Sequence, residues 1–118
     1  MSKTPIDYLS HILIECNYIK DVLNDENDFD KFIADETLKR AVVRSLEIIG
    51  DATKQITADL KYKWSNIKWR NIAGMRDKLI HDDIGVNYSI VWDVAKKRIP
   101  ELIIQITEVI ENEKDKFK

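Results

Sequence analysis

The chain has 118 residues, which fits a single domain over residues 1–118 and is too short for two domains of ordinary size. Apolar residues make up 44% and charged residues 34%, with three glycines and two prolines, a composition typical of helix-rich globular proteins and not of disordered or fibrous ones. A net charge of −2 argues against strong bulk attraction to nucleic acid, and no apolar run is long enough for a membrane span.

The first half of the chain predicts two amphipathic helices. The sequence TPID places Thr4 at an N-cap, Pro5 at the first helical position and Asp7 in the first turn. Apolar residues then recur every three or four positions until the polar run NDENDFD. The same spacing predicts a second helix from about Lys31 to Leu60, in which Gly50 indicates a close helix crossing or a small bend.

The second half predicts two more helices. The apolar stripe of a third helix, ending near His81, consists of Trp69, Ile72, Met75 and Leu79. After the interruption DDIGVN, a fourth helix runs from about Tyr88 towards Lys114, and Pro100 should kink or divide it. No segment alternates with the period of a strand. The predicted fold class is therefore all-α, a four-helix bundle with or without a short extra helix.

The charges are unevenly distributed along the chain. Residues 1–60 carry seven Lys or Arg against twelve Asp or Glu, whereas residues 61–98 carry nine against four. The second segment predicts a local basic surface, and the acidic first segment fits a counter-patch for a partner. The single cysteine, Cys16, excludes an intramolecular disulfide, and no secretory signal pattern opens the sequence. These features predict a cytoplasmic protein that does not enter membranes.

Most catalytic motifs are missing from the sequence. It has no Gly-rich phosphate loop, no H-E-x-x-H, no paired cysteines and no nucleophile elbow. The two histidines, His11 and His81, are too few for an obvious transition-metal site. We therefore expect neither a metal nor a cofactor.

The remaining candidate for chemistry is the stretch from Arg76 to His81. In a continuous helix Asp77 and His81 share one face, so Asp77 can orient the imidazole for general acid–base work near neutral pH. Arg76 would point about 140° away from His81 in such a helix, and its guanidinium fork suits phosphate oxygens. A twofold dimer, or unwinding of the helix near Ile80, would bring these groups to one phosphate ester.

Other interpretations of the same residues stay open at this point. An arginine, an aspartate and a histidine also fit a solvated helix end, where His81 complements the negative end of the helix dipole. His11 fits a structural or an exposed position. The tryptophans fit either stacking on RNA bases or packing in a core or interface; they are Trp64, Trp69 and Trp92.

Three stretches of the sequence resemble the HepT family of HEPN-domain toxins, in order and spacing and over nearly the whole chain. They are AVVRSLEIIGDATKQI, WRNIAGMRDKLIHDDIGVNYSIVWDV and RIPELIIQI. The HEPN signature, an arginine followed by a polar residue and, a few positions later, by a histidine, falls on Arg76, Asp77 and His81. The resemblance implies a helical bundle that forms a homodimer with a composite, metal-independent endoribonuclease site.

By this resemblance, His81 acts as general base or acid while the ribose 2′-hydroxyl attacks the adjacent phosphorus, which leaves a 2′,3′-cyclic phosphate. Arg76 stabilises the charge that develops on phosphorus, and Asp77 orients groups in the cleft. We add Lys78 and Arg70 as residues that contact the RNA substrate, either tRNA or mRNA.

The resemblance also implies the toxin of a type VII toxin–antitoxin system, silenced by a MntA-like minimal nucleotidyltransferase antitoxin. That antitoxin transfers AMP to a tyrosine two positions after the histidine in family members, a position that Asp83 occupies in this sequence. Tyr88 lies further on, and we do not transfer the modification to it. An aspartate at this position is consistent with three explanations. The protein is regulated by binding alone, it is a substituted variant, or it is a relative whose nuclease activity has weakened. The alternative function is a non-catalytic helical subunit that binds the nucleotidyltransferase, and a nucleotide-sensing helical domain is a third.

Overall fold

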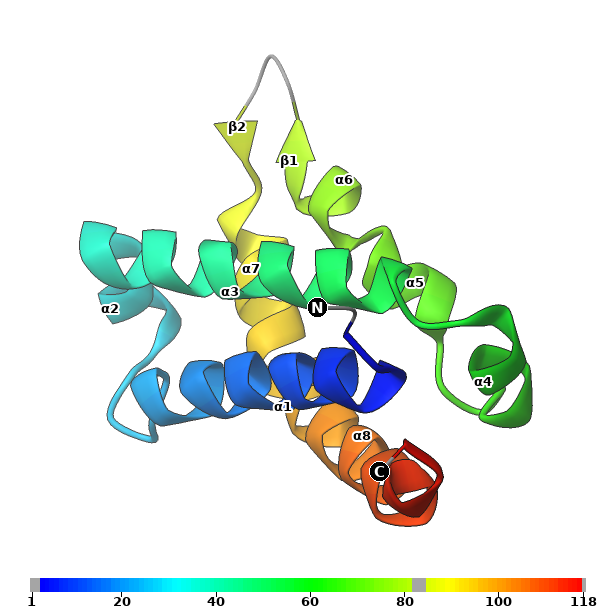
Figure 1. Cartoon of the computed structure of the whole chain (residues 1–118). Coiled ribbons are helices and arrows are strands. Elements are labelled where there is room, and N and C mark those ends of the chain that lie inside the picture. The colour runs from blue at the N-terminus through cyan, green and yellow to red at the C-terminus, as the bar shows by residue number, and fades with distance from the viewer. Residues whose placement is uncertain (1–2, 82–84, 118) are drawn as a thin grey trace.

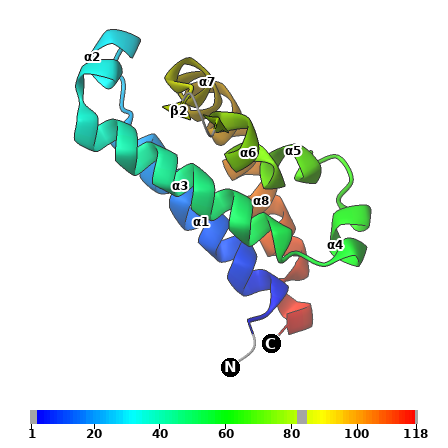
Figure 2. The same cartoon turned by 90° about the horizontal axis from the view of Figure 1, so that it is seen from above.

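The computed structural model describes residues 3–81 and 85–117 and confirms the all-α fold class. The three long helices are α1 (Pro5–Val22), α3 (Glu36–Lys54) and α8 (Ile99–Glu113). The shorter elements are α2 (Phe29–Ala34), α4 (Ala58–Lys63), α5 (Trp69–Ala73), α6 (Met75–Leu79), β1 (Ile80–His81), β2 (Gly85–Val86) and α7 (Tyr88–Asp93). Helices α1 and α3 lie side by side and antiparallel, and α8 packs against α1 (Figure 1, and from above in Figure 2).

The first helix begins as its capping sequence predicts. The Thr4 hydroxyl accepts a hydrogen bond from the Asp7 backbone N–H at 3.3 Å, and the Asp7 carboxylate accepts one from the Thr4 N–H at 2.8 Å. This reciprocal pair satisfies two backbone donors that a helix start otherwise leaves without partners. Pro5 follows at the first helical position, where its missing N–H costs nothing.

The single helix predicted from Lys31 to Leu60 is wrong, because the chain divides into α2, α3 and α4 over this range. The Asp35 carboxylate accepts a hydrogen bond from the Leu38 N–H at 3.0 Å, which ends one helix and starts the next. The Thr57 hydroxyl caps α4 in the same way through the Leu60 N–H at 3.4 Å. Both breaks lie at side chains that compete with the helical backbone for its own donors.

The fourth predicted helix is divided, as Pro100 indicates. A π-helical segment, Val94–Arg98, joins α7 to α8, and Pro100 occupies the second position of α8. Pro100 has no N–H to donate to the carbonyl four residues back, and the Ile99 N–H donates to the Val94 carbonyl five residues back, which is the hydrogen bond of a π-helix. A 3₁₀ turn, Lys114–Phe117, follows α8.

The hydrophobic core lies between α1, α3 and α8 and extends under the shorter helices. Cys16 is fully buried in it, and burial raises the pKa of this thiol to about 12, so it stays protonated and unreactive near neutral pH. Phe32 of α2 is fully buried and packs against the rings of Tyr88 and Trp92. Trp69 is buried as well, so the core interpretation of the tryptophans is the one that the structure supports.

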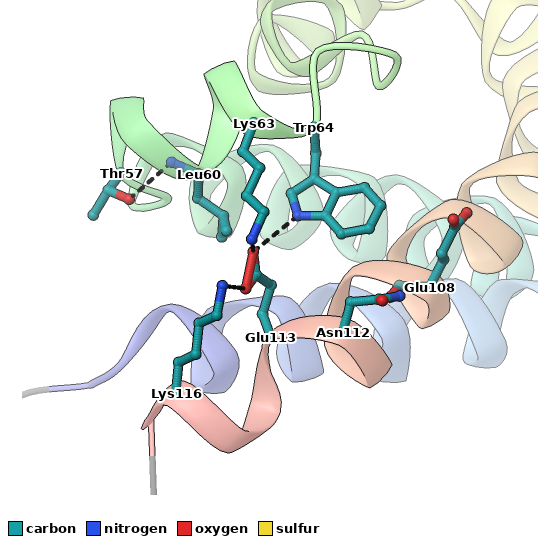
Figure 3. A network of polar contacts seen from close by, with 8 residues as sticks. All are labelled: Thr57, Leu60, Lys63, Trp64, Glu108, Asn112, Glu113 and Lys116. Carbon is teal, nitrogen blue, oxygen red and sulfur yellow. Dashed lines mark hydrogen bonds and ion pairs between the residues drawn. The ribbon is translucent and has the colours of Figure 1, made fainter.

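A buried carboxylate links α4 to the C-terminal end of the chain. Glu113, only 2% exposed, accepts hydrogen bonds from Lys63 Nζ at 2.7 Å, Lys116 Nζ at 3.0 Å and Trp64 Nε1 at 3.2 Å (Figure 3). These donors, led by Lys63, lower the pKa of Glu113 to about 2 despite its burial. The Trp64 indole thus has a structural partner and is not a free platform for bases.

Within residues 3–81 and 85–117, no helix combines the length and the apolar character needed to cross a lipid bilayer.

Candidate active site

Helix α6 presents the three charged residues of the candidate motif on one short turn. Met75 and Leu79 at its two ends are buried and fix the helix to the core. Arg76, Asp77 and Lys78 between them are exposed. The turn therefore offers two cations and one carboxylate to solvent while its ends stay anchored.

The predicted third helix is wrong at its C-terminal end. Gly74 separates α5 from α6, and the chain leaves the helix after Leu79 to form β1. His81 pairs with Gly85 and Ile80 with Val86 in a short antiparallel ribbon, and the Asn87 N–H donates to the Leu79 carbonyl at 3.0 Å. Gly85 has a φ of +84°, a left-handed conformation that suits glycine and directs the chain back.

The ribbon changes the geometry expected for the motif. Because His81 is not helical, Asp77 and His81 do not share a helix face, and the angle of about 140° between Arg76 and His81 does not apply. The unwinding considered near Ile80 is what the backbone shows. The side chains of Ile80 and His81 lie outside the described part of the molecule, as does Asp83 with residues 82–84.

Glu47 on α3 is a neighbour of the motif that the sequence did not indicate. Its Oε2 lies 4.0 Å from Arg76 Nε and accepts a hydrogen bond from Arg44 Nη1 at 3.5 Å. The Arg76 side chain remains 54% exposed, so this long ion pair orients the guanidinium and leaves most of it accessible. Glu47 lies 29 positions before Arg76, and no local pattern connects the two.

Gly50 explains how α3 comes so close to the helices that carry the motif. A Cβ at this position would lie 3.4 Å from the backbone oxygens of both Ile72 and Ala73 in α5. The close helix crossing predicted at Gly50 is therefore confirmed. It sets α5 and the following α6 directly against α3, one turn from Glu47.

The other residues predicted near the site fall in different places. Lys78 lines a cavity between α5–α6 and the segment 94–105, whereas Arg70 is exposed outside that cavity. Tyr88 is half-buried against Phe32, with Lys39 Nζ 4.7 Å from its ring centroid, so it serves packing. His11 is exposed and its Nε2 lies 3.5 Å from Lys3 Nζ. In the described ranges, no three His, Cys, Asp or Glu residues gather as metal ligands.

The helical fold and the exposed Arg–Asp–Lys turn that leads into His81 define a small all-α protein with a candidate phosphate-handling site. A family described as "Ribonuclease HepT-like" matches residues 12–109, and the chain belongs to this family of ribonucleases.

Two relatives named as ribonucleases are similar to this chain over most of their length. It is 48% identical over 112 residues to a protein named "Putative RNase" from Caldanaerobacter subterraneus subsp. tengcongensis, a match that covers 95% of this chain and 99% of the relative. It is 40% identical over 102 residues to "Probable ribonuclease HepT" from Thermococcus cleftensis, covering 86% of this chain and 92% of the relative. No solved structure matches the chain significantly.

Proposed function

We propose that the chain is an endoribonuclease that cleaves RNA without a metal ion, using Arg76, His81 and Asp77. The observation that carries this proposal is the exposed α6 turn, which leads directly to His81 and whose arginine has, among the described residues, a single long side-chain contact, 4.0 Å to Glu47. A guanidinium available in this way can bind a phosphodiester and stabilise negative charge that grows on it.

The proposed reaction is an internal transesterification. A base removes the proton of the ribose 2′-hydroxyl, the 2′-oxygen bonds to the adjacent phosphorus, and the bond from phosphorus to the 5′-oxygen breaks. An acid protonates the departing 5′-oxygen, so the products are a 2′,3′-cyclic phosphate and a 5′-hydroxyl. The imidazole of His81 suits both proton transfers because histidine is the side chain that commonly serves as both general base and general acid.

Two such imidazoles are needed if one takes a proton while the other gives one. A twofold dimer would supply them, because each chain contributes one His81 beside one Arg76. The ion pair with Glu47 holds each arginine against α3 of its own chain. Lys78 and Arg70, both exposed, would hold flanking parts of the RNA. Asp77 would orient groups in the cleft, although it does not share a helix face with His81.

Cleavage in the presence of EDTA tests this proposal. We expect the purified protein, with a mass in solution of about twice the 13.8 kDa chain, to cleave tRNA or mRNA in EDTA. Mass spectrometry of the fragments should find 2′,3′-cyclic phosphate ends. Cleavage that stops in EDTA and returns with Mg²⁺ would reject the metal-independent mechanism.

We further propose that the protein is the toxin of a toxin–antitoxin pair and that a MntA-like nucleotidyltransferase silences it by binding. Asp83 has no hydroxyl to accept AMP, and the acidic first sixty residues offer a surface for a partner. Co-purification with a nucleotidyltransferase encoded beside it should yield a complex in which nuclease activity is lost and no AMP is attached. An AMP adduct on the chain would contradict silencing by binding. A complex whose released chain still cleaves no RNA favours the non-catalytic subunit instead.

A further inference from the structure

A cavity of about 180 Å³ lies beside α6, between α5–α6 and the segment that joins α7 to α8. A cavity of about 150 Å³ can hold one benzene ring, so this cavity suits one small group and not a folded element. Its apolar lining comes from both sides and consists of Ile72, Met75, Val94, Ile99 and Leu102. A flat, weakly polar ring could rest on such a lining.

Three cations line the same cavity: Lys68, Lys78 and Arg98. Among the described residues their side chains have no ion pair or hydrogen bond, whereas the neighbouring Lys97 pairs with Asp93 at 2.9 Å. One carboxylate, Glu101, also lines the cavity, so three positive and one negative side chain leave a formal charge of +2. Unpaired like charges around a concave surface favour an anionic ligand.

Polar amides complete the lining. Asn66, Asn71 and Gln105 each offer both hydrogen-bond donors and acceptors, which are the groups that nucleobase edges present. The cavity therefore combines an apolar surface, amide groups and excess positive charge. This combination fits a base together with its phosphate better than it fits a lone inorganic anion or an apolar ligand.

We propose that this cavity binds one nucleotide of single-stranded RNA, with the base against the apolar lining and the phosphates at the three cations. The proposal rests on the proposed RNA cleavage and names a subsite for the strand that is cleaved. Lys78 lies two residues after Arg76 on the same turn of α6, and Arg76 contacts α3 whereas Lys78 faces the cavity. An RNA strand that crosses α6 would thus reach both.

The test measures binding of a short fluorescent 2′-O-methyl RNA, whose blocked 2′-oxygen prevents cleavage. The variant Lys68→Ala/Arg98→Ala should weaken binding by about tenfold. The salt dependence of log K should become shallower by about 1.4, because each phosphate contact to a single strand contributes about 0.7. The matched control is Lys20→Ala/Lys54→Ala, two cations elsewhere whose side chains also lack partners among the described residues. It should change binding by less than about twofold.

A second pair of variants tests occupancy of the cavity without changing charge. Gln105→Trp fills the cavity and should weaken RNA binding by about tenfold, the loss expected when one base can no longer stack. Ile104→Trp places the same ring at the next, 71% exposed position and should leave binding unchanged. Melting curves followed by circular dichroism should show that all four variants remain folded.

Three results would overturn the proposal. They are equal losses in the two double variants, equal effects of the two tryptophans, and displacement of the oligonucleotide by free AMP as effectively as by unlabelled RNA. The last result would mean that the cavity takes free nucleotides. The nuclease proposal is judged separately, because binding of an uncleavable strand does not depend on His81 and cleavage lost in a His81 variant does not depend on the cavity.

Discussion

Replacing His81 with alanine is expected to lower the rate of RNA cleavage by about 10²–10⁴-fold, the usual contribution of a positioned general acid or base. The protein should stay folded, because the backbone of His81 belongs to a two-residue strand after α6 and not to one of the long helices. Single-turnover cleavage of a labelled RNA in EDTA measures this loss. Binding of the 2′-O-methyl strand by the same variant should be unchanged.

Arg76 provides a second, independent variant for the same reaction. Arg76→Ala should reduce single-turnover cleavage by about 10²–10³-fold, because charge on the phosphorus oxygens loses its donor in the transition state. Arg76→Lys should recover only part of the rate, since an ammonium keeps the charge but not the planar fork. The control is Arg40→Ala, an arginine on α3 whose side chain is 80% exposed and pairs loosely with Glu36.

Rates in His81→Ala or Arg76→Ala equal to that of the unchanged protein would remove these residues from the mechanism. A loss in Arg40→Ala as large as in Arg76→Ala would mean that the arginines act through overall charge.

A further prediction concerns Asp77. With the helix ending at Leu79, Asp77→Asn should cost less than either of the other substitutions, because the helical register that would hold the carboxylate against the imidazole is absent.

Local signals predicted the start of the first helix, and they worked because the cause is local. Thr4, Pro5 and Asp7 satisfy or remove the first backbone donors within one turn. The second helix failed for the opposite reason. Its apolar spacing continues from Ile56 to Leu60 across Thr57, so periodicity cannot show the break that the Thr57 cap creates there.

The residues of the candidate site are a prediction from the sequence motif, whereas the backbone geometry around them could not be predicted from it. The motif from Arg76 to His81 is visible in the sequence, but the short ribbon depends on Gly85 and on the hydrogen bond from Asn87 to Leu79. The contact between Arg76 and Glu47 depends on α3 crossing α5 at Gly50. Such contacts join segments far apart in the chain, and a spacing rule within one helix contains no information about them.

The second large effect that we expect is a loss of stability when the network around the buried Glu113 is changed. Glu113→Gln should lower the melting temperature at pH 7 by roughly 5 °C or more, because one buried charge that balances Lys63 and Lys116 is removed. The neutral amide keeps the shape of the side chain and can still accept a hydrogen bond from Trp64. The drop in melting temperature therefore measures the contribution of the charge and not of the packing. Thermal melts of the two proteins measure it.

The stability lost in Glu113→Gln should depend on pH. Lys63 and the other donors hold the pKa of Glu113 at about 2 in the folded protein, below the ordinary value of 4.5 expected for the unfolded chain. The stabilisation is therefore present above about pH 4.5 and is lost as the pH falls through the folded value near 2. The difference in melting temperature between the unchanged protein and Glu113→Gln should be constant near neutrality and shrink over this acid range.

Glu111→Gln is the matched control for this series. Its carboxylate also accepts from a lysine, Lys114, at 3.0 Å, but both side chains are about half or more exposed. Exposed pairs of this kind contribute little because water solvates both ions. If Glu111→Gln lowers the melting temperature as much as Glu113→Gln does, or if the Glu113 difference is the same at every pH, then burial of the network is not what stabilises the end of α8 against α4.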